Sequence, residues 1–195
     1  MNEIAFRQTE GLEKERAILN KLFSGEAIPV NKFKGANGFY NILGDRADYF
    51  ANKQVNAKQF MLLEPIIYFE ADGEYVTIVL PGVLHDFASK AFLKATGKFS
   101  TPAIIHDSLY GSHIVSRKDS DEIFYNAMLT TGTAKYRAYS YWLVVRAVGG
   151  ISAYNKVTDA QKENARKFVY RIKREEFEQT KNFVWDTSEA SIKRD

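Results

Sequence analysis

The sequence predicts an α+β fold, in which a small antiparallel β-hairpin or sheet is followed by a mainly helical bundle with a long C-terminal helix. Two observations predict it. Runs rich in β-branched and aromatic residues occupy 60–70 and 74–80, on either side of an Asp-Gly pair that is typical of a hairpin turn. From residue 101 onward, apolar residues recur at helical spacing, and glycines stand where the helices would end.

The N-terminal part is expected to contribute less regular structure. Residues 9–23 carry leucine and isoleucine at near-helical spacing, which predicts one helix. Residues 24–58 show no clear period, so we expect irregular chain with a short helix near 45–51. After the second strand, residues 86–97 are expected to form a short helix that Gly97 closes.

Two helices are predicted next, joined as a hairpin. Pro102 suits the first turn of a helix that ends at Gly111, because its missing amide hydrogen is not needed there. Ser116 is a candidate N-cap for the following helix, and Asp119 in the first turn favours the helix dipole. This second helix is expected to run to residue 131, with Gly132 as its terminator.

Two further helices are predicted over 134–148 and 158–185. The glycine pair at 149–150 is expected to end the first of these, and its aromatic residues are expected in the core, namely Tyr136, Tyr139 and Trp142. An apolar stripe on the second helix would pack on the domain or dock on a neighbouring subunit. The stripe consists of Ala165, Phe168, Val169 and Ile172.

The 195 residues are expected to form a single domain, with an N-terminal extension (1–58), a core (59–150) and a C-terminal helical arm (151–195). A composition of 45% hydrophobic and 26% charged residues is typical of soluble globular proteins. The net charge of +3 is too small to indicate nucleic-acid binding. The absence of cysteine excludes disulfides and cysteine nucleophiles. Neither a signal peptide nor a transmembrane segment is apparent.

The predicted hairpin of residues 101–131 brings a histidine opposite an acid. If its turn is centred between residues 113 and 114, His106 and Asp121 lie at the same level on facing helices. Tyr110 is the i+4 neighbour of His106, so it shares the same face. A carboxylate can hold one ring nitrogen of a histidine and leave the other for proton transfer or metal binding. His106, Asp121 and Tyr110 are therefore the candidate catalytic residues.

Two interpretations of this pair stay open. The pair is either a satisfied structural contact between helices or the centre of a reaction. Asp107 points roughly 100° away from His106 on the helix, so one could face Asp121 while the other faces a metal or a water. Asp86 follows the end of a strand and is a second candidate metal ligand, or else the cap of the helix that begins there.

Three blocks of residues match the sequence motifs of a known family, and three residues of the helix predicted after them match that family's last helix. The matching positions are Gly82, Asp86, Ala88, Ser89, His106, Asp107, Leu109, Tyr110, Ser116, Arg117, Asp121, Phe124, Ala127, Met128, Tyr141, Arg146 and Gly149. Over about residues 76–150 the chain resembles a phage-associated family known only as domain of unknown function 1353. The chain departs from the pattern at Pro81, at His85, which adds a second imidazole near Asp86, and at Ala91.

The same hairpin is more weakly similar to the catalytic helix pair of phospholipase A2. That likeness implies His106 as the base that activates water and Asp121 as the residue that orients it. It implies calcium or another divalent cation at Asp107, although the glycine-rich calcium loop and the disulfides of those enzymes are missing. No other cofactor is indicated.

Two functions follow as expectations. The first is a phage-encoded virion structural or assembly component, with phage structural proteins or further copies of the chain as partners. The second is a metal-assisted hydrolase that acts on lipid or cell-wall substrates. The resemblance implies a location in the virion or in the host cytoplasm.

Overall fold

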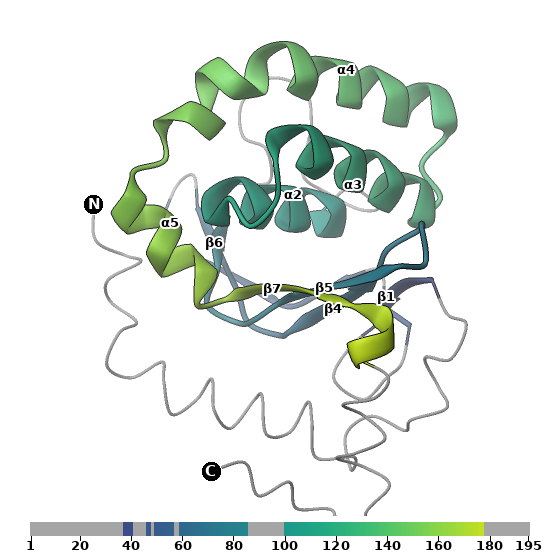
Figure 1. Ribbon diagram of the computed structural model, residues 1–195, viewed down its shortest axis with the longest axis horizontal. Helices are drawn as coiled ribbons and strands as arrows, with labels where there is room; N and C mark the ends of the chain where they lie inside the picture. Colours follow the sequence, from purple (N-terminus) through teal and green to yellow (C-terminus); the bar gives the residue numbers. More distant parts are fainter. Residues whose placement is uncertain (1–36, 41–45, 48, 57–58, 86–99, 178–195) are drawn as a thin grey trace, which may run out of the picture.

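The computed structural model describes residues 37–40, 46–47, 49–56, 59–85 and 100–177 (Figure 1). Two antiparallel sheets accompany the helices, so the predicted α+β class is confirmed. Figure 1 shows three layers, with the larger sheet at the base, helices α2 and α3 above it, and helix α4 outermost. The helices predicted over 9–23 and 86–97 lie outside the described residues, and so does Asp86.

The larger sheet has the strand order β1-β4-β5-β7, and all its pairings are antiparallel. Its strands are β1 (Gly38–Tyr40), β4 (Ile66–Phe69), β5 (Tyr75–Val79) and β7 (Val169–Lys173). The predicted hairpin joins β4 to β5, and Gly73 adopts the positive φ of 78° that its turn requires. The amide of Glu70 donates to the carbonyl of Tyr75 at 3.1 Å and closes the turn.

The core of the domain lies around β4. All four of its residues are fully buried, so side chains on both faces of the strand are covered. This explains why the strand is a continuous apolar run rather than an alternating one. Phe39 of β1 stacks on Tyr68 at a centroid distance of 4.4 Å, and Phe177 packs edge-on against Phe69 at 5.6 Å. Sequence-distant segments therefore close over the same strand.

A second sheet of three strands has the order β2-β3-β6, formed by β2 (Asn52–Gln54), β3 (Phe60–Leu62) and β6 (Leu84–His85). The run at 60–70 is therefore two strands and not one. The break falls at residues 63–65, where Pro65 has no amide hydrogen for a ladder. The short helix expected near 45–51 is also wrong for the described residues, because Arg46 pairs with Tyr40 in an isolated bridge.

The predicted helical hairpin is present as α2 (Ser100–Ser112) and α3 (Arg117–Thr130). Ser116 caps α3 as expected, since its hydroxyl accepts from the amide of Asp119 at 3.1 Å. Gly132 follows the end of α3 with a positive φ of 79°. Helix α2 is buried almost all round because it lies between α3, α5 and the sheets.

Helix α4 (Lys135–Ser152) is longer than expected. It continues through Gly149 and Gly150, so the predicted stop at this glycine pair is wrong. Two of the three aromatic residues expected in the core are at the surface, because Tyr136 is 70% exposed and Tyr139 is 54% exposed, whereas Trp142 is half-buried. The helix packs on α3 through the opposite side, where Ala138, Tyr141 and Val145 meet Phe124 and Met128. None of the described helices is long and apolar enough to span a membrane.

The predicted long helix over 158–185 is wrong. A short 3₁₀ turn, η3 (Tyr154–Lys156), leads into helix α5 (Asp159–Arg166), which begins with a capping box of Thr158 and Gln161. The chain then forms β7, which adds to the open edge of β5. The apolar stripe misled the prediction, because Val169 and Ile172 face the core from a strand and not from a helix.

Candidate functional site

Helices α2 and α3 bring together the histidine and the acid that their sequence spacing placed at one level. His106 Nε2 lies 2.9 Å from Asp121 Oδ1. Both side chains are buried, with His106 4% exposed and Asp121 fully covered. Because an ionised carboxylate is costly to bury alone, the geometry around Asp121 must supply further partners.

Two further side chains supply them. The Tyr110 hydroxyl donates to Asp121 Oδ1 at 2.5 Å, and Arg146 of α4 donates to Oδ2 at 3.0 Å. Asp121, on α3, is thus bonded to residues of both α2 and α4. We call His106, Tyr110, Asp121 and Arg146 the Asp121 network. It ties the three helices together at one buried point.

Aromatic rings enclose the imidazole of His106. Its centroid lies 4.0 Å from that of Tyr110 and 4.7 Å from that of Phe124. Tyr154 of η3 packs edge-on against Tyr110 at 5.1 Å, and its own ring stacks on His113 at 3.8 Å. The histidine is therefore held in one orientation by ring contacts as well as by its hydrogen bond.

The pKa directions in the network follow from this burial. Burial lowers the pKa of His106 below its ordinary value, although Asp121 opposes the shift. Burial alone would raise the pKa of Asp121, but hydrogen bonds from His106, Tyr110 and Arg146 outweigh it and lower the pKa. Burial and the bond to Asp121 raise the pKa of Tyr110. The network therefore holds a neutral imidazole, a neutral phenol and an ionised carboxylate.

Helix α4 approaches the hairpin very closely beside the network. A Cβ at Gly149 would lie 2.7 Å from the Tyr110 hydroxyl, and one at Gly150 would lie 3.1 Å from the Arg117 guanidinium. Arg117 in turn donates to the carbonyl of Arg146 at 3.0 Å. The glycine pair inside a helix is thus explained by close packing. Helical spacing alone could not reveal this, because the contact partner lies on another helix.

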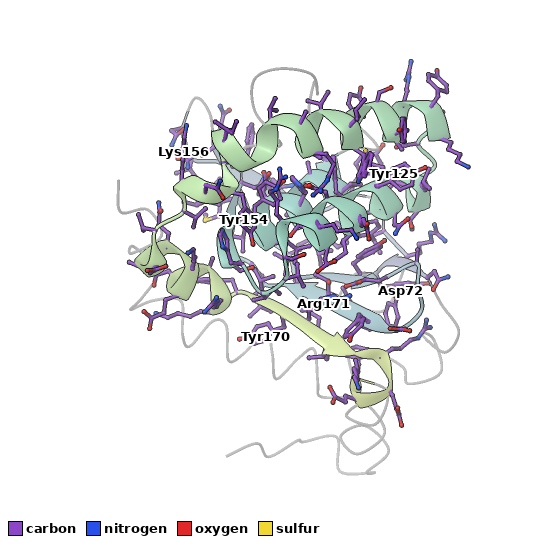
Figure 2. The ribbon with its side chains drawn as sticks, turned by 45° about the horizontal axis from the view of Figure 1, so that its top comes forward. Asp72, Tyr125, Tyr154, Lys156, Tyr170 and Arg171 are labelled. Atoms are coloured by element: carbon purple, nitrogen blue, oxygen red, sulfur yellow. The ribbon has the colours of Figure 1, made fainter. Side chains whose placement is uncertain are left out.

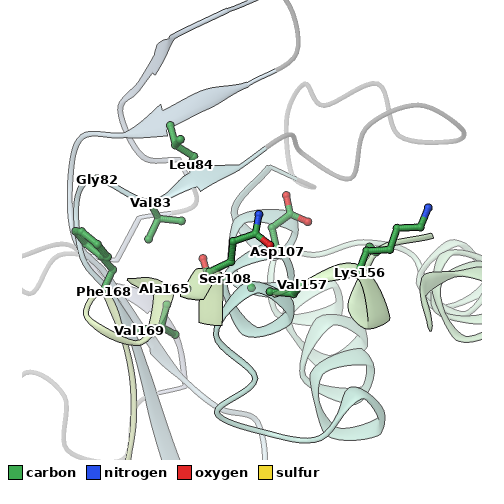
Figure 3. Close-up of a pocket in the computed structure, with 13 residues that line it drawn as sticks. Gly82, Val83, Leu84, Asp107, Ser108, Lys156, Val157, Ala165, Phe168 and Val169 are labelled. Atoms are coloured by element: carbon green, nitrogen blue, oxygen red, sulfur yellow. The ribbon is translucent and has the colours of Figure 1, made fainter. Parts of the chain in front are cut away.

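Asp107 faces a different part of the molecule from His106, as adjacent helical positions require. It lines a cavity of about 300 Å³ together with Ser108, and Val83, Leu84 and Phe168 supply apolar walls. Figure 3 shows Asp107 and Ser108 on one side of this cavity, while the amine of Lys156 extends away from them. His106 does not line it. The Ser108 hydroxyl donates to the carbonyl of Ile104 at 2.6 Å.

The other sequence candidates lie apart from the network. His85 lies in β6, where its Nε2 is 2.7 Å from Asn52 Oδ1 and its ring stacks on Phe60. Asp86 is not among the described residues. Within the described ranges, no group of three or more histidine and acidic side chains could hold a metal ion. Arg146 is the network member that sequence reasoning left without a role, and its place in the closing helix of the matched pattern was its only signal.

Fold and site together define the class of this molecule: an α+β domain whose helices are joined by a buried His-Asp-Tyr-Arg network. Residues 60–145 match a family described as "Protein of unknown function (DUF1353)". The resemblance seen over residues 76–150 is thereby confirmed, and residues 60–145 are similar to this family. No curated protein and no solved structure is significantly similar to the chain.

Proposed function

We propose that the protein is a non-enzymatic assembly component of a phage particle, which associates through the outer face of helix α4. The observation that carries the proposal is the exposure of large apolar side chains on that face. Leu143 is 52% exposed and Ile151 is 79% exposed, alongside Tyr136 and Tyr139. Clusters of exposed apolar side chains on a soluble domain mark contact surfaces.

The pattern on this face suits another helix. Tyr136, Ser140, Leu143 and Ala147 recur at intervals of four and three residues, which is the spacing of a helix–helix seam. Within this seam, the larger side chains of Tyr136 and Leu143 lie in the first half of α4 and the small Ala147 lies in the second half. An antiparallel pair centred on Leu143 would therefore set Tyr139 of one copy against Ala147 of the other.

Charge supports the same arrangement. Helix α4 carries three basic residues, Lys135, Arg137 and Arg146, and no acidic residue. In an antiparallel pair, Lys135 and Arg137 of one copy would lie near the last turn of the other copy's helix. The carbonyl groups at that end carry partial negative charge, so basic side chains are favourable there. A twofold pair of this chain is accordingly the partner that we favour over a different structural protein.

The Asp121 network fits a supporting role in such a component. Arg146 lies on α4 itself and reaches through to Asp121, so the network fixes the helix that presents the contact face. A rigid presenting element lowers the entropy lost on association. In this proposal the His106–Asp121 pair positions a surface and performs no reaction.

The test is the oligomeric state of the purified chain, measured by sedimentation velocity across a concentration series. We expect reversible self-association that Leu143→Glu abolishes, because a charge would be buried in the seam. Leu63→Glu is the matched control, since Leu63 is 46% exposed but lies beside the small sheet. A wild-type chain that stays monomeric, or equal behaviour of the two variants, would contradict self-association. Binding of a purified virion protein that Leu143→Glu prevents would then identify a different partner.

The hydrolase alternative has less support from the geometry. A general base must reach the proton that it abstracts, and the ring of His106 is enclosed by Tyr110 and Phe124. The cavity beside Asp107 is lined without His106, so the suggested base and the suggested calcium ligand face different spaces. Turnover of phospholipid or cell-wall substrate that His106→Ala abolishes while the fold persists would favour the enzyme.

A further inference from the structure

A cleft of about 340 Å³ lies between the turn joining β4 to β5 and one face of α3, and we call it the acidic cleft. Asp119, Glu122 and Asn126 follow the i, i+3, i+7 spacing and so line it from one face of α3. Asp72 and Glu74 line it from the turn. Figure 2 shows Asp72 and Arg171 on the side of the sheet that lies toward α3.

The acidic cleft contains more negative than positive charge. The one basic side chain among its lining residues is Arg171, and it is committed to the buried Glu70 through two bonds of 2.9 Å. Its guanidinium also lies 3.6 Å from the ring centroid of Tyr75. The remaining lining carboxylates are therefore not balanced within the cleft, and they belong to Asp72, Glu74, Asp119 and Glu122.

These carboxylates have local contacts that leave acceptor capacity. Asp119 accepts from the Ser116 hydroxyl at 2.6 Å, and Asp72 accepts from the amide of Glu74 at 2.9 Å. Lys118 approaches Glu122 only to 4.0 Å, and both side chains are well exposed. A carboxylate has about four lone-pair sites, so one such bond does not saturate it. Further donors can approach from the open side.

A buried hydroxyl lines the same cleft. Tyr68 is fully buried, and its hydroxyl has no hydrogen-bond partner in the described structure. The Thr130 side chain and the backbone of Ala71 lie near enough to lower the pKa of the phenol, but neither makes a hydrogen bond to it of acceptable geometry, and the Thr130 hydroxyl donates to the carbonyl of Asn126 at 2.9 Å. Burial raises the pKa of Tyr68, with the nearby Glu70 and Asp72 adding to the rise, so the phenol stays neutral. A buried polar group without a partner costs free energy, which a ligand with an N–H group would recover.

We propose that the acidic cleft binds a primary alkylammonium group, with the Tyr68 hydroxyl accepting one N–H bond and the surrounding carboxylates accepting the others. An ammonium group carries three donors, which matches acceptors that converge from a turn and a helix. A metal ion suits the cleft less, because no three acidic side chains in the described structure converge tightly enough to hold one. The proposal is independent of association through α4.

The group could belong to a free polyamine or to a lysine side chain of a partner, and the experiment separates these sources. Spermidine and a lysine-containing peptide are titrated separately into the full chain by calorimetry. An analogue of each that is acetylated on every amine nitrogen removes the ammonium charge. We expect saturable binding of at least one probe that acetylation abolishes. Binding of spermidine assigns a free amine, and binding of the peptide alone assigns a protein-borne lysine.

Variants place the binding in the cleft. Tyr68→Phe keeps the ring that stacks on Phe39 and removes only the hydroxyl, so we expect a stable fold and about tenfold weaker binding. Tyr170→Phe is the matched control, since its hydroxyl bonds to the carbonyl of Lys167 away from the cleft. Glu122→Gln should also weaken binding, whereas Glu163→Gln in α5, away from the cleft, should not.

Three results would overturn the proposal. The first is no saturable binding of either probe. The second is equal affinity of wild type and Tyr68→Phe, since the hydroxyl would then play no part. The third is displacement of the amine by calcium chloride at equal ionic strength far beyond that caused by sodium chloride, which would assign the cleft to a divalent cation.

Discussion

The hydroxyl of Tyr110 lies so close to the backbone of Gly149 that a single methyl group at that glycine would stand 2.7 Å from the oxygen. The same hydroxyl donates to Asp121 at 2.5 Å, so it cannot rotate away without breaking that bond. The buried network and the position of α4 are therefore coupled through one phenol. In the proposed function, the position of the contact face on the opposite side of α4 depends on this coupling.

Gly149→Ala should destabilise the fold by about 2 kcal/mol, because the added methyl group overpacks the contact with Tyr110. In an ordinary helix interior the same change would stabilise the fold by about 1 kcal/mol. The sign of the change in the free energy of unfolding is therefore diagnostic of the close contact. Urea denaturation measures it. Gly150→Ala is the control and should cost less, because the nearest atoms there are the flexible end of Arg117. A Gly149→Ala variant as stable as wild type would contradict the close contact.

Asp121→Asn should destabilise the fold by about 3 kcal/mol, because it removes the charge that Arg146 and His106 share in a buried site. Denaturant titration followed by circular dichroism measures the loss. Asp159→Asn is a suitable comparison, since that carboxylate is exposed at the start of α5, and it should leave the unfolding midpoint nearly unchanged. An equally small effect at Asp121 would show that the network adds little to stability.

Stability should decline as pH falls from 7 to 5. Burial lowers the pKa of His106, so the unfolded chain takes up a proton that the folded chain refuses. Below the unfolded value of about 6.5 the unfolded state binds more protons, and the free energy of unfolding decreases with pH. Asp121 adds a second loss in the same direction in stronger acid, because its pKa is lowered as well.

Unfolding free energies measured between about pH 7.5 and 5 separate the histidines. His106→Gln should be less stable than wild type and should lose most of the decline near the ordinary histidine pKa of about 6.5. The pKa of His113 is also lowered by burial, and it is more exposed, so His113→Gln should change the slope less. A slope that His106→Gln leaves unaltered would argue against a buried neutral imidazole.

Arg171→Met should destabilise the fold by about 2 kcal/mol, because it leaves the carboxylate of Glu70 buried without its cation. The value lies below that for a fully buried pair, since the Arg171 side chain is 20% exposed. Thermal unfolding at low and high salt measures it. Replacing both partners, with Glu70→Gln added, should recover part of the loss. No recovery in the double variant would show that packing on Tyr75 matters more than charge.

Much of the fold is predictable where local chemistry determines it. The Asp72–Gly73 turn, the Ser116 cap and the Gly132 terminator each act within a few residues, and each is present as expected. The His106–Asp121 contact followed from counting across one short turn, because both helices are regular. These features depend on nearest neighbours, which a single sequence contains.

The remaining features depend on partners that are distant in sequence. Gly149 lies inside α4 and does not end it. A glycine stands there because Tyr110, on another helix, leaves no room for a side chain. Val169 and Ile172 fit one face of a helix, whereas in β7 they point to opposite faces of the sheet, and the open edge of β5 decides for the strand. The role of Arg146 likewise requires knowing that α4 crosses the buried end of Asp121.

The position of β7 has a consequence for synthesis of the protein. Arg171 and Glu70 are 101 residues apart in the chain, and all of α2 to α5 lies between the strands that they join. As the chain leaves the ribosome, the β4–β5 hairpin emerges before β7. The edge of β5 therefore stays unpaired until β7 has been synthesised. Unpaired edges invite pairing with other chains. Translation that halts before residue 169 should therefore leave a nascent chain whose β5 edge is unpaired and prone to aggregate.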